Sequence, residues 1–225
     1  MSEVIAGEQT EEASETIGSA IESSIESSRK FLQTMLSRRS IRAFSRVRPN
    51  MELILNAVRT AASGPSGANS QPWHFAIIRD AEIKRRLREA AENTEREFYE
   101  FKAPAGLLDD LKPFRTNFSK PHLTEAPYLI AVFSRSVSDN ATASGSSYYA
   151  RESTGIAVGL LLSSLQVAGL STLTHTPNPM TFLNECLGLD RSYRPYMIVV
   201  VGYKADEAFV PDLTKKRLED VCSVF

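Results

Sequence analysis

The sequence predicts one compact domain of the α+β or mixed α/β class, with four or five short strands among at least five helices. Helical and strand patterns alternate along most of the 225 residues, a length that suits a single domain. Residues 128–134 are continuously apolar, which predicts a strand buried on both faces. Residues 150–168 are apolar nearly all round a helix, so we expect this helix to be buried on all sides, partly by a second subunit.

The composition is that of an ordinary soluble globular protein, with 42% hydrophobic and 24% charged residues. A net charge of -1 gives no general attraction to nucleic acid or anionic lipid. No apolar run approaches the ~18 residues of a membrane span, and no signal peptide is visible. Cys186 and Cys222 form no CxxC pair, so we expect no metal site and a reducing, cytoplasmic compartment.

Residues 1–28 are acidic and serine-rich and contain no Lys or Arg. This composition predicts a tail that is partly disordered or helical. Ile17, Ile21 and Ile25 recur every four residues, which would place a narrow apolar stripe on a helix and could lie on a partner surface. A stronger helical pattern opens at Arg29, so the folded domain is expected to span 29–225.

The regular elements are expected at defined places in that domain. Asp80 has the position of an N-cap and Gly169 that of a residue ending a helix. Residues 102–125, which contain several prolines, are expected to be irregular. The expected helices are 51–62, 81–101 and 150–168, and the expected strands are 74–80, 128–134, 170–176 and 196–203.

Arginines cluster in the sequence Arg-Arg-Ser-Ile-Arg. Arg38, Arg39 and Arg42 lie within five residues, with Ser40 between them. Guanidinium groups donate paired hydrogen bonds to phosphate oxygens, which would suit a phosphate site. On composition alone, the cluster is better explained as cations at the C-terminus of a helix, where they interact favourably with the helix dipole.

The sequence PSGANSQPW (65–73) is a loop with little side-chain bulk before the only tryptophan of the chain. Ser66, Gly67 and Ala68 expose consecutive backbone N–H groups, which can form a concave anion site. Taken by itself, the loop is also a plain connector between a helix and a strand.

The strand around residue 175 ends in Thr-His-Thr-Pro. Thr174 and Thr176 point to one face of the strand and His175 to the other. The two hydroxyls could hydrogen-bond a planar heterocycle, although the preference of threonine for strands also explains them.

A carboxylate and a phenol share one helical face, since Glu95 and Tyr99 are four residues apart. Lys120 follows in the irregular segment and could fold back toward them. The three side chains could hold an amino-acid zwitterion, or they could belong to an ordinary solvated surface.

The order of these patterns resembles the flavin-dependent nitroreductase superfamily over about residues 30–218. Within it, the Glu95, Tyr99 and Lys120 set is similar to the iodotyrosine deiodinase family. The resemblance implies a nitroreductase-like fold, in which helices flank a central mixed or antiparallel sheet. It also implies an intertwined homodimer with FMN at the interface, a lid at about 92–122, and a C-terminal extension, 204–225, that packs on the partner subunit.

The resemblance also implies roles for single residues. The Thr176 hydroxyl would lie near the flavin N5 atom, and the Ala68 N–H would point at the substrate phenolate, so these two are the expected catalytic residues. Lys215 stands where the family usually has arginine. The substrate residues implied are Ala68, Glu95, Tyr99 and Lys120. The FMN residues implied are Arg38, Arg39, Ser40, Arg42, Ser66, Gly67, Thr174, His175, Thr176 and Lys215.

The implied activity is reductive removal of halide from halogenated tyrosines, with NADPH, NADH or a reductase as the electron donor. Two features depart from the animal members of the family. The chain reads Ala-Asn-Ser-Gln-Pro-Trp where they read Ala-His-Thr-Glu-Pro-Trp, and we expect it to lack their N-terminal membrane anchor. The alternatives are a general NAD(P)H-dependent nitro or quinone reductase of the same fold and a non-catalytic flavin-binding protein.

Overall fold

The computed structural model describes residues 2–135 and 149–225, and the chain divides into two units, 1–38 and 39–225. The first unit consists of helix α1, Ser2–Leu36. Helical structure therefore continues through residue 29 without a break, whereas the sequence pattern suggested that a new helix opens there. Ile17, Ile21 and Ile25 are all exposed on this helix. Met1 lies outside the described residues.

A four-stranded sheet forms the centre of the second unit, in the order β1-β2-β4-β3. The strands are β1 (Trp73–Ile78), β2 (Tyr128–Arg135), β3 (Ser171–His175) and β4 (Tyr193–Gly202). Every pair of neighbouring strands is antiparallel. All four expected strands are present, with ends shifted by a few residues, and the predicted α+β architecture is confirmed.

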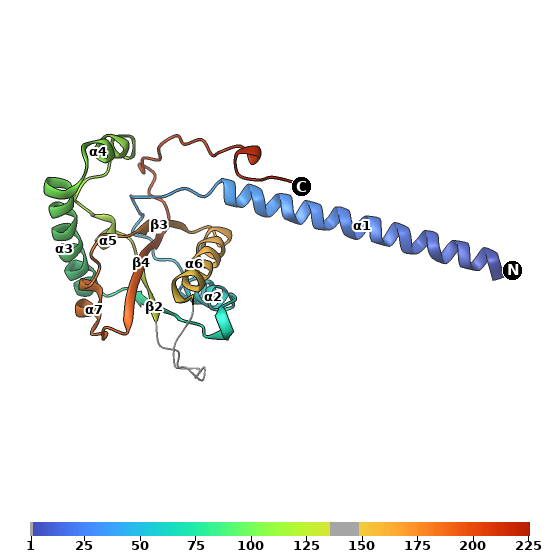
Figure 1. Ribbon diagram of the computed structural model, residues 1–225, viewed down its shortest axis with the longest axis horizontal. Coiled ribbons are helices and arrows are strands. Elements are labelled where there is room, and N and C mark those ends of the chain that lie inside the picture. Colours follow the sequence, from blue (N-terminus) through green and yellow to red (C-terminus); the bar gives the residue numbers. More distant parts are fainter. Residues whose placement is uncertain (1, 136–148) are drawn as a thin grey trace. The chain divides into compact units, whose positions relative to one another are not determined.

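Helices cover both faces of this sheet (Figure 1). Helices α2 (Met51–Ala62) and α6 (Ala150–Val167) lie on one face. Helices α3 (Ala81–Glu97), α5 (His122–Glu125) and α7 (Phe182–Leu187) lie on the other. The sheet therefore separates two hydrophobic cores.

Strand β2 contributes to both cores, as its continuous apolar run predicts. Leu129, Ala131 and Phe133 pack toward α3, α5 and α7, while the alternate residues pack toward α2 and α6. Successive side chains of a strand point to opposite faces, so a central strand covered on both faces must be apolar at every position.

Helix ends follow the local signals in the sequence. The Asn50 side chain accepts the N–H of Glu52 at the start of α2, and the Asp80 side chain accepts the N–H of Ile83 at the start of α3, both at 2.9 Å. Gly169, which follows α6, has a left-handed φ of +74°.

Helix α6 is only partly buried within a single chain. Ala157, Leu161 and Leu165 are fully buried, but Ile156 and Val167 are 48% and 64% exposed. The four-stranded sheet and α2 cover only part of the helix surface, so the expected burial on all sides depends on cover from a second subunit, which stays a prediction.

The region between α3 and α5 is more regular than expected. Helix α3 ends at Glu97 and continues into a π-helical turn, η2 (Phe98–Lys102). Helix α4 (Ala105–Leu111) and the turn η3 (Lys112–Phe114) follow, in a stretch for which the sequence predicted no helix.

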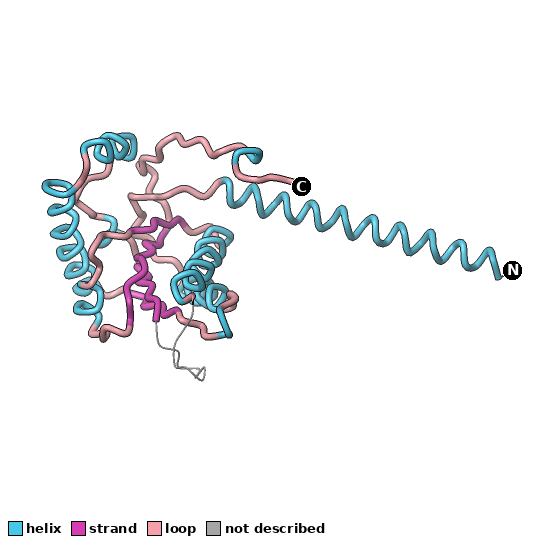
Figure 2. The backbone as a smooth tube through the Cα atoms, viewed as in Figure 1, coloured by secondary structure: helices cyan, strands magenta, loops and turns pink. Residues whose placement is uncertain are grey.

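Segments at both ends of the second unit are mostly loop (Figure 2). They are held by isolated bridges, a parallel one between Ser40 and Thr172 and an antiparallel one between Phe44 and Lys204. Residues 40–44 therefore lie beside β3 and the end of β4, although they are distant from them in sequence.

Candidate functional site

The segment that carries Ser40 and Arg42 is fixed along strand β3. The N–H of Ile41 donates to the carbonyl of Thr172 at 3.0 Å, next to the bridge formed by Ser40. This pairing holds the backbone immediately before Arg42, and the bridge between Phe44 and Lys204 holds it two residues later. Arg38 belongs to the first unit of the chain and Arg39 to the second.

The guanidinium of Arg42 lies near the substrate residues that the sequence predicted. Its charge is close enough to Tyr99, Lys120 and His122 to influence the pKa of each. Burial lowers the pKa of Arg42 itself, and its guanidinium carbon lies 5.8 Å from the centre of the Phe114 ring. No acidic side chain among the described residues pairs with it, so Arg42 is a half-buried cation available to an anionic ligand.

Glu95, Tyr99 and Lys120 are brought together as the sequence suggested. The Lys120 ammonium forms an ion pair with Glu95 Oε2 at 3.1 Å and lies 5.3 Å from the centre of the Tyr99 ring. The side chains of Lys120 and Glu95 are only 5% and 14% exposed. Lys120 Nζ also donates to the carbonyl of Asn117 and, at 3.4 Å, to the hydroxyl of Thr116.

Burial sets the protonation properties of this group. It lowers the pKa of Lys120, although the adjacent Glu95 carboxylate opposes the shift. Burial also raises the pKa of Tyr99, which Thr116 and Arg42 offset only in part. The phenol therefore remains a neutral hydrogen-bonding group, and the ion pair is the charged centre of the cluster.

A cavity of about 240 Å³ opens beside these residues. Two arginines, Arg42 and Arg115, line it together with hydroxyl and amide groups, and no acidic residue does. Its lining residues are Arg42, Arg115, Thr116, Asn117, Ser119, Pro121 and His122. The cavity is thus suited to an anion or to the polar end of a ligand.

The strand end at Thr174, His175 and Thr176 has the predicted alternation. Both threonines are exposed and His175 is buried at 7% exposure. His175 stacks edge-on against His122, with ring centres 5.5 Å apart, and the Nε2 atoms of both rings are buried with no hydrogen-bond partner. The predicted face for a planar ligand is therefore the threonine face.

The loop 65–72 forms a tight turn, η1 (Gly67–Asn69). The Ser66 side chain accepts the N–H of Gln71 at 2.9 Å, and Ala68 has a left-handed φ of 50°. The N–H groups of Gly67 and Ala68 have no acceptor among the described residues. A strained backbone with free amides suits a binding loop.

This loop is not joined to the other candidate residues within one chain. In Figure 1 it lies near α2, on the other side of the sheet from α3. No hydrogen bond among the described residues connects it to Arg42 or to the Glu95 cluster. Lys215 lies in the exposed C-terminal segment. Upstream of it, the carbonyl of Pro211 accepts a hydrogen bond from the Arg39 guanidinium.

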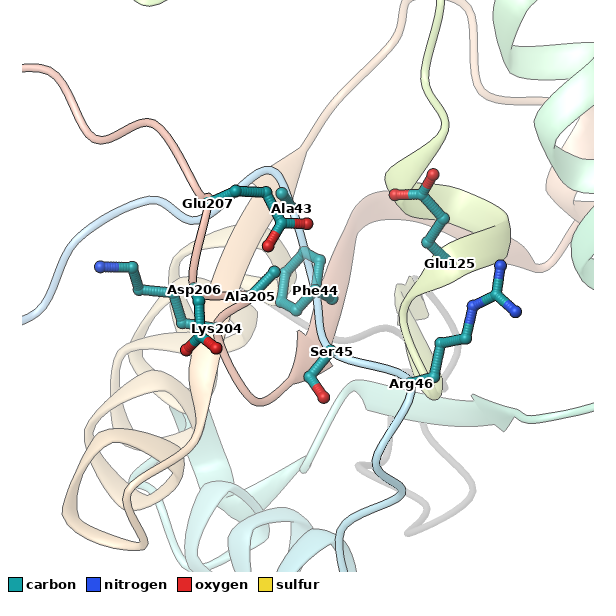
Figure 3. A pocket seen from close by; sticks show the side chains of 9 residues that line it. All are labelled: Ala43, Phe44, Ser45, Arg46, Glu125, Lys204, Ala205, Asp206 and Glu207. Carbon is teal, nitrogen blue, oxygen red and sulfur yellow. The ribbon is translucent and has the colours of Figure 1, made fainter.

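A second cavity, of about 380 Å³, contains none of the predicted residues (Figure 3). Phe44 stands in its centre, with Arg46 and Glu125 on one side and Lys204 and Glu207 on the other. Because groups of both charges line it, it offers no consistent preference for one class of ligand.

Sequence reasoning did not identify Arg115, His122 or Glu92 as part of this region. Arg115 and His122 line the cavity beside Arg42, and Glu92 accepts the backbone N–H of Lys120 at 2.7 Å. The only sequence signal for Glu92 is its position three residues before Glu95, on the same helical face.

Comparison with known proteins gives a consistent result. The model of the Nitroreductase family matches residues 35–203. An iodotyrosine deiodinase of Haliscomenobacter hydrossis is 43% identical over 206 residues, which are 91% of this chain and 92% of that protein. The human iodotyrosine deiodinase 1 is 37% identical over 88% of this chain and 69% of its own length.

Solved structures agree with these matches. A crystal structure of oxidized iodotyrosine deiodinase bound to FMN and 3-iodo-L-tyrosine aligns with a TM-score of 0.73 and 32% identity, covering 83% of this chain and 94% of that one. A BluB-like flavoprotein from Clostridium difficile aligns with a TM-score of 0.66 at 21% identity, over 86% of this chain and 98% of that one. These alignments confirm the predicted nitroreductase-like fold.

Proposed function

The chain belongs to the nitroreductase family and, within it, to the iodotyrosine deiodinases, and on this premise we propose that it is an FMN-dependent oxidoreductase that removes halide reductively from halogenated tyrosines. The products are tyrosine and halide. The observation that carries the proposal is the buried ion pair of Lys120 and Glu95 beside Tyr99, because it matches the two opposite charges of an amino acid.

The described residues fit FMN as the cofactor. Arg42 is a cation without an acidic partner, and the Gly67 and Ala68 N–H groups are free to bind an anionic or carbonyl oxygen. The exposed Thr174 and Thr176 hydroxyls offer hydrogen bonds from one strand face. We assign the binding of FMN to these groups together with Arg38, Arg39, Ser40, Ser66, His175 and Lys215. When bound, FMN supplies the electrons for the reduction.

The lid residues would hold the amino-acid end of the substrate. At neutral pH a halotyrosine carries an ammonium and a carboxylate, which pair with Glu95 and Lys120 respectively. The two side chains are paired with each other in the ligand-free chain, so the substrate exchanges one ion pair for two and leaves no charge unpaired. Tyr99 adds a hydrogen bond, and closure of residues 92–122 excludes water.

Ala68 would act at the other end of the substrate. Its N–H has no acceptor among the described residues, so it could donate to the phenolate oxygen of the halotyrosine. This hydrogen bond stabilises the ionised ring in the orientation required for reduction. Thr176 would donate a hydrogen bond to the flavin.

A homodimer would bring these two parts together. Within one chain, no hydrogen bond among the described residues links the loop of Ala68 to the Glu95 cluster, so a second copy is the natural source of the loop. Helix α6 offers a surface for the partner, because Ile156, Gly159 and Val167 form an exposed stripe of apolar and small residues. The C-terminal segment 204–225 carries further exposed apolar side chains, among them Leu218, Val221 and Phe225.

The electron donor is proposed to be NAD(P)H or a separate reductase, and the location to be cytoplasmic. The free thiols of Cys186 and Cys222 support a reducing compartment. In the part of the chain that the structure describes, no helix has both the length and the apolar character needed to cross a membrane.

The test is anaerobic oxidation of the FMN-loaded, reduced protein by 3-iodotyrosine, compared with oxidation by a nitroaromatic compound. We expect rapid oxidation by iodotyrosine and release of iodide and tyrosine. Oxidation by the nitroaromatic alone would instead support a general nitro or quinone reductase. A colourless protein that takes up no added FMN would contradict both activities.

Two substitutions test the residue assignments. Glu95→Gln and Lys120→Ala should each weaken halotyrosine binding by about tenfold or more, because each leaves one charge of the zwitterion unpaired. Calorimetric titration of the FMN-loaded protein with 3-iodotyrosine measures the effect. Unchanged affinity in both variants would exclude these residues from the substrate site.

A further inference from the structure

A second carboxylate lies one helical turn before Glu95 on α3. Glu92 Oε1 accepts the backbone N–H of Lys120 at 2.7 Å and the Nε–H of Arg88, also at 2.7 Å. Its side chain is 20% exposed and that of Arg88 is 30% exposed, so water competes only weakly for these hydrogen bonds. The two carboxylates thus contact the same lysine at different points.

The two contacts have different consequences for Lys120. Glu95 pairs with the ammonium at the tip of the side chain, 3.1 Å away, and Glu92 holds the peptide from which that side chain begins. A long, flexible lysine side chain loses conformational entropy when it is fixed at one point. Anchoring the backbone removes part of that cost before the ammonium meets a ligand.

The hydrogen bond between Glu92 and the Lys120 N–H is one of a row of polar contacts along α3. Lys84 Nζ donates to the carbonyls of Thr124 and Ala126 at 3.1 and 2.8 Å. Arg88 Nη1 donates to the hydroxyl of Thr124 at 2.9 Å. The row therefore binds the short helix α5 to α3, and Glu92 extends it to the first residue that is proposed to touch substrate.

The charge state of Glu92 agrees with this role. Burial alone would raise its pKa, but the Lys120 N–H, Arg88 and Ser119 together hold the pKa below its usual value. Glu92 therefore stays ionised at neutral pH and remains a strong acceptor for the Lys120 amide.

We infer that Glu92 is a positioning residue for the zwitterion end of the substrate, acting through Lys120. This inference rests on the proposed function. It assigns to Glu92 no contact with substrate or cofactor, only the placement of the Lys120 peptide relative to Glu95. The affinity for a substrate analogue without the ammonium and carboxylate should then not depend on Glu92.

The experiment compares Glu92→Ala and Glu92→Gln in the FMN-loaded protein with Glu89→Ala as the matched control. Glu89 lies on the same helix, but its side chain is 60% exposed, and its one ion-pair partner among the described residues is Arg85. Binding is measured by calorimetry for 3-iodotyrosine and for 2-iodophenol, which has the same ring without the ammonium and carboxylate. Hydrogen exchange of the peptide that contains the Lys120 amide is the second measurement.

We expect Glu92→Ala to weaken 3-iodotyrosine binding about tenfold and to leave 2-iodophenol binding unchanged. Glu92→Gln, which still offers an amide oxygen to the Lys120 N–H, should weaken 3-iodotyrosine binding by only about two- to threefold. Exchange of the Lys120 amide should be faster in Glu92→Ala than in Glu89→Ala or the unchanged protein.

Unchanged 3-iodotyrosine affinity in Glu92→Ala would overturn the inference. Equal weakening of both ligands would also overturn it, because it would show a general structural role. If Glu92→Ala does not fold, the selectivity of Glu92→Gln between the two ligands decides the matter. If the unchanged protein does not bind 3-iodotyrosine, the proposed function fails. If hydrogen exchange of the Lys120 amide is the same in Glu92→Ala as in the unchanged protein, Glu92 does not hold the Lys120 backbone and the inference is contradicted.

Discussion

Lowering the pH should destabilise the protein through the buried pair His122 and His175. The two residues are 5% and 7% exposed, and their Nε2 atoms have no hydrogen-bond partner. Burial lowers the pKa of each to about 3, helped for His122 by His175 and Lys120 and for His175 by Lys120. Both imidazoles are therefore neutral in the folded protein at every pH at which the fold is expected to persist.

The sign of the effect follows from the two protonation states. In the unfolded chain each histidine takes up a proton as the pH falls through about 6.5, but in the folded chain it does so only near pH 3. The stabilising contribution is thus complete above about pH 6.5 and is lost progressively toward about pH 3. Between about pH 7 and pH 5.5 the loss is about 1.3 kcal/mol for each histidine and about 2.5 kcal/mol for the pair.

Urea unfolding at fixed protein and FMN concentrations measures this loss. The double variant His122→Asn/His175→Asn lacks both titrating groups, so its free energy of unfolding should fall by about 2.5 kcal/mol less over the same pH interval. His74→Asn is the matched control, because His74 is only half-buried and should contribute less to the pH dependence of the free energy of unfolding. A pH dependence of the double variant within about 0.5 kcal/mol of that of the unchanged protein would refute the reasoning.

Three further substitutions test other parts of the structure. In Gly159→Ala the added carbon has no neighbour within 4 Å among the described residues, and alanine favours the helix by about 1 kcal/mol. Weaker dimerisation in sedimentation experiments is therefore expected only if α6 packs on a second copy, and unchanged or tighter association would contradict that interface. Gly202→Ala would place a carbon 2.8 Å from Pro127 Cδ and 3.1 Å from Phe44 Cδ1, which should lower the free energy of unfolding by about 1–3 kcal/mol. Urea unfolding measures this loss, and an unaltered midpoint would show that the two neighbours can move aside at little cost. Lys215→Arg should tighten FMN binding about threefold, because a guanidinium group binds phosphate with two parallel hydrogen bonds. A fluorescence titration measures the dissociation constant, and an unchanged value would exclude Lys215 from the cofactor site.

Elements whose signals are local could be predicted from the sequence. Helix α2 has the expected limits because Asn50 caps it and its apolar residues repeat at helical spacing. Strand β2 could be recognised because a central strand leaves no position for a polar residue facing water. In both cases a short window of sequence contains the whole physical cause.

Other elements depend on neighbours that are distant in sequence. Helix α4 lies in a stretch with Pro104 and Gly106, residues that ordinarily disfavour helices, yet Pro104 stands at the N-cap, where a missing N–H is harmless. For α6, the apolar pattern predicted that one chain alone would leave part of the helix uncovered, but it could not show that Ile156 would be among the exposed residues.

The candidate site shows the same division. The resemblance to iodotyrosine deiodinases implied the proximity of Lys120 to Glu95, which the residues alone left open. The hydrogen bond from the Lys120 N–H to Glu92 could not be predicted, because every residue except proline has a backbone N–H and the sequence does not show which of them binds a side chain. The edge-on contact of His122 with His175 could not be predicted either, because it joins α5 and β3, which are distant in sequence.

The pairing of Ser40 with Thr172 and of Phe44 with Lys204 has a consequence for the synthesis of the protein. The arginine segment leaves the ribosome early, but the strands that hold it in place are translated near the end of the domain. Contacts between such distant parts of a chain form slowly and late in folding. A nascent chain that stops before Thr172 therefore lacks the pairing that holds the backbone next to Arg42, and one that stops before Lys204 lacks the bridge to Phe44. We expect cofactor uptake only after most of the domain has been synthesised.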